Sequence, residues 1–319
     1  MLPNMSENVS ENNEKRLVLE EIQRSCQDHV SIVVLDSVQD FSKGCDQFVY
    51  FVSRERLDSL IIKYPKEEKD KIEKQVIMAE NSASYGFNSS TVLHHTADYL
   101  IEKYIPGESL SVEKHGNCKV VWIELGRQMK LVHTIPGDGF SNRIRGETST
   151  KFPIYNSYYD KMVEGLKWED SHAIPGVDRY LTEMLQLSKS RIIATVHLHY
   201  DVAFDNVIVT THSTETVEDV GQTVTMIDFA DAGMGDKWED FAFLYCNLFE
   251  TPRLLEYIFK GYGNVETEDI VWIEFYCVVW LTWALSGDDQ PEKRVRQLRV
   301  AEKIVEKGLI WLDSMLAEV

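Results

Sequence analysis

The chain has 319 residues, of which 33 are basic and 52 acidic, and its formal net charge is −19. So acidic a surface repels nucleic acid, whose binding proteins need a basic patch, and attracts small cationic molecules. Solubility alone would explain the charge equally well. Hydrophobic residues make up 44% of the chain, which is enough for a large core and excludes global disorder. No apolar run reaches about 18 residues, so no membrane span is expected.

The beginning of the chain and its cysteines favour a cytoplasmic location. Residues 1–16 are polar and lack the apolar stretch of a signal peptide, so we expect a disordered lead-in. The five cysteines are scattered and show no CxxC or Cys/His spacing. Neither a disulfide framework nor a zinc site is therefore expected, and a reduced compartment fits best.

The first third of the chain predicts a small, mainly antiparallel sheet with one helix. β-branched and aromatic runs bounded by polar turns predict strands at 30–35, 48–52, 60–64, 91–93 and 99–105. The charged segment 66–82 carries an apolar stripe at helical spacing. Pro106-Gly107 then forms a sharp break. We expect an α+β fold with a nucleotide-binding lobe at 17–105 and a larger, mainly helical lobe at 106–319.

The second part of the chain shows helical periodicity. It predicts helices at 118–133, 155–166 and 178–193, and a helical region from Trp238 to the end. The polar, glycine-bearing segment 136–151 predicts a mobile loop, and 211–221 predicts a hairpin loop between two strands. Four tryptophans on apolar faces are expected to be core residues rather than a cofactor site: Trp272, Trp280, Trp283 and Trp311.

The segment that begins at His199 carries the chemistry. His199-Tyr-Asp201 is followed by Asn206, five residues after the aspartate, and a hydrophobic strand farther along ends in Asp228. Phosphoryl transfer from a nucleotide needs one carboxylate to orient the attacking hydroxyl, and an amide and a second carboxylate to hold Mg²⁺. We therefore predict Asp201 as the catalytic base and Asn206 and Asp228 as the Mg²⁺ ligands. His199 is expected to brace the loop.

The residues after this strand are predicted to be mainly scaffold. Asp236 is expected to be the N-cap of a helix that begins near residue 238. Asp240, inside that helix, is expected to accept hydrogen bonds from the backbone of the loop at 199–206. Asp231 and Glu239 are the candidates for substrate contact, and a structural role stays open for Asp231.

A lysine on the third predicted strand is the candidate phosphate ligand. Lys63 stands in an otherwise apolar strand, where an unpaired buried charge would be very costly. Nucleotide phosphates and a helix carboxylate would neutralise it. We favour Glu73 over Glu80 as that carboxylate, because a helix of normal length then remains between Glu73 and the loop at 84–90. An exposed lysine at a strand edge is the alternative. Gly44 is the one glycine where a phosphate-covering loop is expected, and the absence of GxxxxGK[ST] excludes a Walker-type loop.

Together these segments resemble the aminoglycoside phosphotransferase family of the protein-kinase-like superfamily. That family carries an H-G-D-x-x-x-x-N loop and a later I-D-F/W-x-D-A-G-x-G-D-P-x-x-D-L-A block. This chain reads H-Y-D-V-A-F-D-N at 199–206 and I-D-F-A-D-A-G-M-G-D-K-W-E-D-F-A at 227–242. Segments 99–108 and 125–135, the second of which contains His133, match more loosely. The chain departs from the pattern with Tyr200 in place of glycine, with lysine in place of proline at 237, and with Ser141 after Phe140.

The resemblance implies a two-lobed protein-kinase-like fold, ATP or GTP as donor, and a hydroxyl of a small molecule as acceptor. It also implies that backbone groups near Glu102 and Tyr104 hold the nucleotide base. An aminoglycoside antibiotic suits the acidic charge. Tyr200 is expected to narrow or reshape the site beside Asp201, which leaves the acceptor open. The alternatives are a metabolic kinase acting on choline, a sugar or a related metabolite, and a pseudokinase, against which the intact motif argues. A protein kinase is disfavoured because no A-P-E segment follows.

Overall fold

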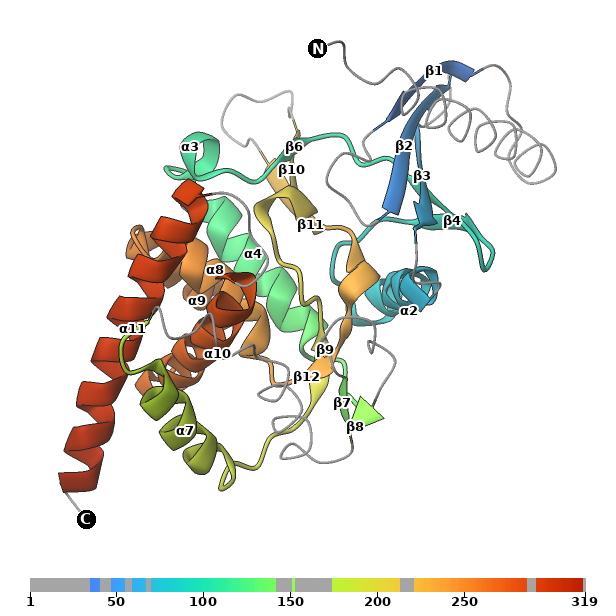
Figure 1. Ribbon diagram of the computed structural model, residues 1–319. Helices are drawn as coiled ribbons and strands as arrows, with labels where there is room; N and C mark the ends of the chain where they lie inside the picture. Colours follow the sequence, from blue (N-terminus) through green and yellow to red (C-terminus); the bar gives the residue numbers. More distant parts are fainter. Residues whose placement is uncertain are drawn as a thin grey trace, which may run out of the picture. The chain divides into compact units, whose positions relative to one another are not determined.

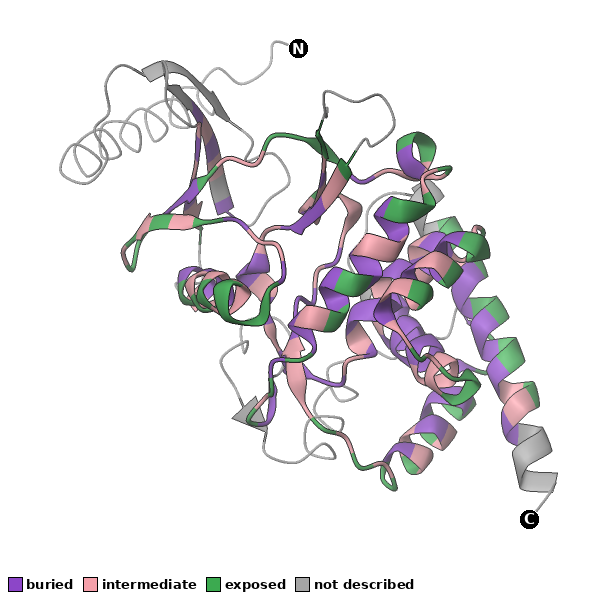
Figure 2. Cartoon of the chain, turned by 180° about the vertical axis from the view of Figure 1, so that it is seen from behind, coloured by how far each residue is buried: buried purple, intermediate pink, exposed green. Residues whose placement is uncertain are grey.

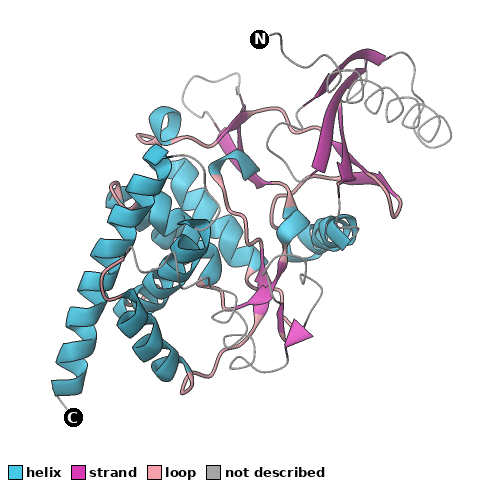
Figure 3. Ribbon diagram, in the orientation of Figure 1, coloured by secondary structure: helices cyan, strands magenta, loops and turns pink. Residues whose placement is uncertain are grey.

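The computed structural model describes residues 35–40, 47–54, 59–66, 70–141, 151–152, 174–212, 221–285 and 291–317. The chain divides into two compact units. The first comprises Met1–Ile72 and Thr91–Tyr104, and the second comprises Glu73–Ser90 and Ile105–Val319. Helices and strands are both present, as Figure 3 shows, and the fold class is α+β as predicted. Gly44, the predicted helix at 155–166 and most of the predicted strand at 30–35 lie outside the described residues.

The first unit contains a five-stranded antiparallel sheet with the order β1-β2-β3-β5-β4. The predicted strands from 48 onward correspond to four of its members, with ends shifted by at most two residues. The strands are β1 Leu35–Asp40, β2 Gln47–Arg54, β3 Leu60–Pro65, β4 Val92–His95 and β5 Leu100–Lys103. On β3, Leu60 and Ile62 point to one buried face, and Lys63 is buried on the other.

Helix α2, Asp70–Tyr85, connects the two units. It lies later in the chain than the predicted 66–82. Most of α2 groups with the second unit rather than with the sheet. Another division between the units follows Tyr104. The predicted functional lobes, 17–105 and 106–319, stay a prediction.

The second unit is built mainly from helices (Figure 1). They are α3 Val112–His115, α4 Lys119–Val132, α7 Val177–Ser188, α8 Glu239–Leu248, α9 Pro252–Tyr262, α10 Thr267–Leu285 and α11 Pro291–Ala317. Their inward faces form one continuous core, which Figure 2 shows as purple stretches. Trp272, Trp280 and Trp311 pack against that core, as predicted. Among the described residues, no helix combines the length and apolarity that a membrane span requires.

Two helices of this core, α4 and α9, cross at backbone contact. A Cβ atom added at Gly126 would lie 1.9 Å from the carbonyl oxygen of Ile258, and one added at Gly261 would lie 1.8 Å from that of Ile123. Any side chain at these two positions would force the helices apart. The crossing fixes the end of α4, where His133 follows, relative to the end of α9, where Tyr262 lies.

Short strands of the second unit position the segments that carry the motif. Strand β10 pairs antiparallel with β11, with Val207 opposite Met226, and β6 lies on the other side of β10. Strand β9 pairs with β12. The elements are β6 Glu108–Ser109, β7 Phe140–Ser141, β8 Lys151–Phe152, β9 Val196–Leu198, β10 Val207–His212, β11 Gly221–Met226 and β12 Gly233–Gly235, with 3-10 helices Phe204–Asn206 and Phe229–Asp231.

Candidate active site

The loop between β9 and β10, residues 199–206, will be called the HxD loop. Its aspartate and its asparagine contact each other directly. The Nδ2 atom of Asn206 donates to the backbone oxygen of Asp201 at 3.0 Å and to its Oδ2 at 2.9 Å. Because both partners are oxygen acceptors, the NH₂ group of the amide faces Asp201. The amide oxygen of Asn206 is then the atom that can face a ligand.

Asp228 follows β11 and is attached to the same loop through its neighbour. The backbone N–H of Ile227 donates to the carbonyl oxygen of Asn206 at 2.9 Å. Asp228 itself has the left-handed conformation φ 61°, ψ 62°, at the start of the 3-10 helix that follows. This conformation costs a non-glycine residue about 1–2 kcal/mol. Asp228 and Tyr200 are the non-glycine residues with positive φ in the described part of the chain; Tyr200 lies within this loop, and Asp228 follows Ile227, which is hydrogen-bonded to the loop.

His199 braces the loop from inside. Its Nδ1 accepts a hydrogen bond from the backbone N–H of Asp201 at 3.3 Å, and its Nε2 lies 2.9 Å from the carbonyl oxygen of Ile227. An amide can only donate and a carbonyl can only accept, so Nδ1 is the acceptor and Nε2 the donor in these two contacts. The ring also lies 4.3 Å from that of Phe229, which in turn contacts Phe87. With both nitrogens engaged, His199 holds the loop and has no nitrogen available as a base.

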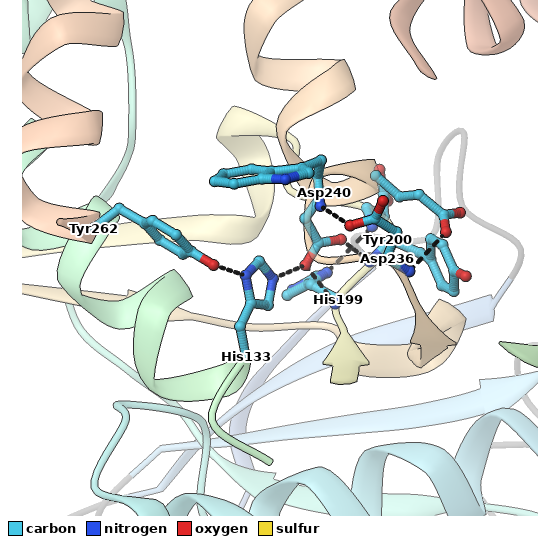
Figure 4. A network of polar contacts seen from close by, with 9 residues as sticks. His133, His199, Tyr200, Asp236, Asp240 and Tyr262 are labelled. Atoms are coloured by element: carbon cyan, nitrogen blue, oxygen red, sulfur yellow. Dashed lines mark hydrogen bonds and ion pairs between the residues drawn. The ribbon is translucent and has the colours of Figure 1, made fainter. Parts of the chain in front are cut away.

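Asp240 on α8 binds the backbone at the start of the HxD loop (Figure 4). Its Oδ2 accepts from the N–H of His199 at 2.9 Å, and its Oδ1 accepts from the N–H of Tyr200 at 2.7 Å. Nε2 of His133 lies 3.0 Å from Oδ2, and Nδ1 of the same ring lies 2.9 Å from the hydroxyl of Tyr262. In Figure 4, His133 and Tyr262 lie on one side of Asp240 and Tyr200 on the other.

The electrostatics of this network favour an ionised Asp240. Burial alone would raise its pKa, but the hydrogen bond and the charge of His133, together with the contacts from His199, hold the pKa below its usual range. The same buried charge acts on Tyr262, because burial and then the negative charge of Asp240 raise the pKa of that phenol. Tyr262 is therefore a neutral hydroxyl at neutral pH.

In the first unit, Lys63 forms a buried ion pair with Glu102. The Nζ and Oε2 atoms are 3.0 Å apart, and the two side chains are 6% and 5% exposed. The predicted partner, Glu73, is exposed on α2. The sheet register explains the difference, because Ile61 lies opposite Glu102, so that Lys63 and Glu102 are diagonal neighbours on one face. Tyr104 directly follows β5, and the centre of its ring lies 4.8 Å from that of Phe51.

Residues 37–275 match the sequence model of the phosphotransferase enzyme family. The match extends over more than half of the chain. The protein belongs to this family. A search of the curated proteins finds no significant sequence match.

Solved structures show that the phosphotransferase has a kinase-like fold. The choline kinase LicA from Streptococcus pneumoniae has a TM-score of 0.63 at 15% identity, over 92% of this chain and 99% of that one. The aminoglycoside phosphotransferase APH(4)-Ia has a TM-score of 0.67 at 13% identity, with the same coverage of both chains. A microcompartment-associated aminopropanol kinase has a TM-score of 0.60 at 16% identity, over 92% and 98%.

The structure assigns Asp236 a different role from the predicted one. The N-cap of α8 is Trp238, and the Oδ1 atom of Asp236 accepts from the Trp238 N–H at 3.3 Å. Its Oδ2 binds Nη1 of Arg191 at 2.7 Å and the hydroxyl of Tyr276 at 3.0 Å. Arg191 also lies 3.9 Å from the ring centre of Trp272. Helix α7 ends at Ser188 and not at the predicted 193, and Arg191, which follows the helix, contacts Asp236.

Glu239 and Asp231 are the candidates for contact with a substrate. Oε1 of Glu239 accepts from the backbone N–H of Asp236 at 3.0 Å, which stabilises the first turn of α8. Asp231 is half-buried at the end of its 3-10 helix. Their proposed contacts with a substrate stay predictions.

Tyr200 is buried, and its hydroxyl donates to the carbonyl oxygen of Met234 at 3.3 Å. A Cβ atom added at Gly235 would lie 2.7 Å from that hydroxyl. The hydroxyl of Tyr200 therefore lies against β12. The expected effect of this residue, to narrow or reshape the site beside Asp201, stays a prediction.

His133 and Tyr262 are site residues that sequence reasoning missed. His133 lies 107 residues before its partner Asp240 in the sequence. Tyr262 lies 129 residues after its partner His133. The only sequence signal was a histidine at the end of an apolar helix, inside a loosely matching segment. For Tyr262 no signal was available, since it looks like one more aromatic residue of an amphipathic helix.

Proposed function

We propose that this phosphotransferase transfers the γ-phosphate of ATP or GTP to a hydroxyl of a small cationic molecule. The observation that carries the proposal is the position of Asp201. One carboxylate oxygen is held by Asn206, and the preceding backbone is fixed by Asp240. A carboxylate in a rigid loop, beside an amide oxygen directed elsewhere, is what phosphoryl transfer requires of the protein.

In the proposed reaction, Asp201 orients the acceptor hydroxyl and takes its proton. Asn206 holds Oδ2, and we assign the other carboxylate oxygen to the hydroxyl. The acceptor oxygen forms a bond to the γ-phosphorus while the bond from that phosphorus to the bridging oxygen breaks, and the nucleoside diphosphate leaves with the electron pair. His199 takes no part in the proton transfer, because both of its nitrogens hold the loop.

The residues around the loop fit a magnesium ion shared with the nucleotide. Among the described residues, no group of three or more His, Cys, Asp or Glu side chains could hold a metal by itself. Asn206 and Asp228 offer two oxygen ligands, and Mg²⁺ in phosphotransfer sites is held by one or two protein ligands together with the phosphates. When bound, the ion would neutralise the negative charge of the phosphates.

The acceptor is proposed to be cationic because of two observations. The chain carries a net charge of −19, which attracts cations and repels anionic metabolites. Moreover, the solved structures that resemble it include an aminoglycoside phosphotransferase, a choline kinase and an aminopropanol kinase, three enzymes named after hydroxyl-bearing amines. We place aminoglycosides first. Choline and amino alcohols form the second candidate class. The resemblance to the choline kinase and to the aminopropanol kinase favours this class.

A panel of acceptors tests the proposal. The purified protein, with ATP or GTP and Mg²⁺, would be offered aminoglycosides, choline, aminopropanol and neutral sugars, and nucleotide consumption and product mass would be measured. We expect turnover with at least one amine and none with the neutral sugars. The Asp201→Asn variant is the control for contaminating kinases. Turnover with sugars alone would contradict the cationic acceptor, and no turnover with any acceptor would contradict the proposed function.

A second prediction concerns the nucleotide. We propose that Lys63 binds the phosphates, with Glu102 fixing its ammonium group in position. Lys63→Met should raise the KM for nucleotide about tenfold or more, because a buried charged hydrogen bond is worth about 1.5–3 kcal/mol. Glu102→Gln should also raise the KM for nucleotide, but by a smaller factor than Lys63→Met. Lys119→Met, which removes one positive charge from an exposed position, is the control. An unchanged KM in Lys63→Met would remove Lys63 from the nucleotide site.

A further inference from the structure

Tyr200 combines a conformation that suits glycine with a side chain that glycine lacks. Its φ angle is 63°, in the left-handed region that residues with a Cβ atom avoid. It lies directly before Asp201, so its backbone angles set the direction in which that carboxylate leaves the chain. Such a conformation persists only where the surroundings hold it in place.

Contacts hold Tyr200 at both its backbone and its side chain. The backbone N–H donates to Oδ1 of Asp240 at 2.7 Å. At the other end, the hydroxyl donates to the carbonyl oxygen of Met234 at 3.3 Å, and the side chain is 6% exposed. Glycine at 235 leaves room for this hydroxyl, because a Cβ atom there would lie 2.7 Å from it. Residue 200 is thus fixed between α8 and β12.

Strand β12 is itself anchored on two sides. It pairs with β9, where Met234 lies opposite His197, and the sulfur of Met234 accepts from the backbone N–H of Asp138 at 3.4 Å. The segment before β7 is bound to the approach of β9 as well, since the N–H of Gly137 donates to the carbonyl oxygen of Thr195 at 2.8 Å. The hydroxyl of Tyr200 therefore contacts a strand that is hydrogen-bonded to β9, which leads directly into the HxD loop.

We propose that Tyr200 is a positioning residue, whose buried phenol ring anchors the left-handed turn that directs the Asp201 carboxylate. The inference rests on the proposed function in so far as Asp201 is the base. Glycine at this position could adopt the same φ angle, but it would leave the turn without an anchor on β12. Asparagine would tolerate the angle and would also lack the ring. The side chain, not the backbone preference, fixes the loop in this chain.

The test compares Tyr200→Gly and Tyr200→Phe with Tyr180→Phe as the matched control. Tyr180 is a buried phenol on α7, away from the HxD loop. Three quantities are measured on each folded variant: the hydrogen exchange of the amides at 199–201, kcat, and KM for nucleotide. In Tyr200→Gly we expect exchange to rise and kcat to fall, each about tenfold or more, with KM unchanged. Tyr200→Phe keeps the ring and should stay within about threefold of the unchanged protein in both.

Tyr180→Phe should change neither the exchange at 199–201 nor kcat. Full protection and full kcat in Tyr200→Gly would overturn the proposal, and so would a loss of protection spread evenly over the second unit. If Tyr200→Gly does not fold, Tyr200→Asn takes its place with the same expected losses. If the unchanged protein phosphorylates no acceptor, the proposed function fails, while the exchange comparison still decides whether Tyr200 holds the loop.

Discussion

Asp201→Asn should lower kcat by about 10²–10⁴-fold, the usual contribution of a general base, and leave nucleotide affinity nearly unchanged. The substitution preserves shape, and the new amide oxygen can still accept from Nδ2 of Asn206. What disappears is the ability to take the proton of the acceptor hydroxyl. The Mg²⁺ ligands proposed here, Asn206 and Asp228, are untouched, so the nucleotide should bind as before.

Asp205→Asn is the matched control for this prediction. Asp205 is exposed, four residues along the same loop, and its replacement removes the same charge. We expect kcat of Asp205→Asn to stay within about twofold of the unchanged protein, because water screens an exposed charge and its interactions with neighbouring groups are weak. Nucleotide affinity would be measured by calorimetry and kcat by coupled assay with the best acceptor of the panel. Equal turnover in Asp201→Asn and in the unchanged protein would show that Asp201 is not the base.

The parts of the site that the sequence predicted are those set by local spacing. Asn206 stands five positions after Asp201, at the end of a short 3-10 helix, and its amide donates back to the carboxylate and backbone oxygen of Asp201. Asp240 was also predicted to bind the loop backbone, and the contacts with His199 and Tyr200 are present. The two strands that follow the loop, β10 and β11, were recognisable because their apolar residues stand at alternate positions, Val207 and Val209 in β10 and Val224 and Met226 in β11.

The parts that the sequence did not predict depend on contacts between distant segments. Lys63 was expected to pair with a glutamate of the following helix, but the register of β3 against β5 brings Glu102 to it instead. No spacing rule gives that register, because it depends on how the strands pair in three dimensions. Likewise, the contact of His133 with Asp240 joins the end of α4 to α8, two segments that lie far apart in the sequence.

The left-handed residues show a further limit of sequence reasoning. Tyr200 and Asp228 both have φ angles near 60°, and neither is a glycine. The sequence marked position 200 only as a departure from a glycine pattern, and suggested a side chain that narrows or reshapes the site beside Asp201. Which way a side chain leaves a left-handed residue depends on the groups that surround it. Here Gly235 and the carbonyl of Met234 provide a buried place against β12.

Asp240→Asn should destabilise the protein by about 3–5 kcal/mol, the typical loss when one member of a buried ionic network is removed. The carboxylate accepts from the N–H groups of His199 and Tyr200 and from His133. An asparagine retains one acceptor oxygen and presents an NH₂ group to a donor, so at least one buried donor is left without a partner. The measurement is urea unfolding of the variant, the unchanged protein and the control Asp205→Asn, which should differ little from the unchanged protein.

The destabilisation by Asp240→Asn should also become smaller as the pH falls. The folded pKa of Asp240 lies below its usual value of 3.8, so its ionisation stabilises the fold above that value, and the effect is lost as pH falls through the folded pKa. The difference in unfolding free energy between the two proteins should therefore be constant above about pH 5 and shrink below about pH 4. A difference that grows as pH falls would mean that Asp240 is protonated in the fold. It could then no longer accept hydrogen bonds through both oxygens, and the network around the HxD loop would need a different account.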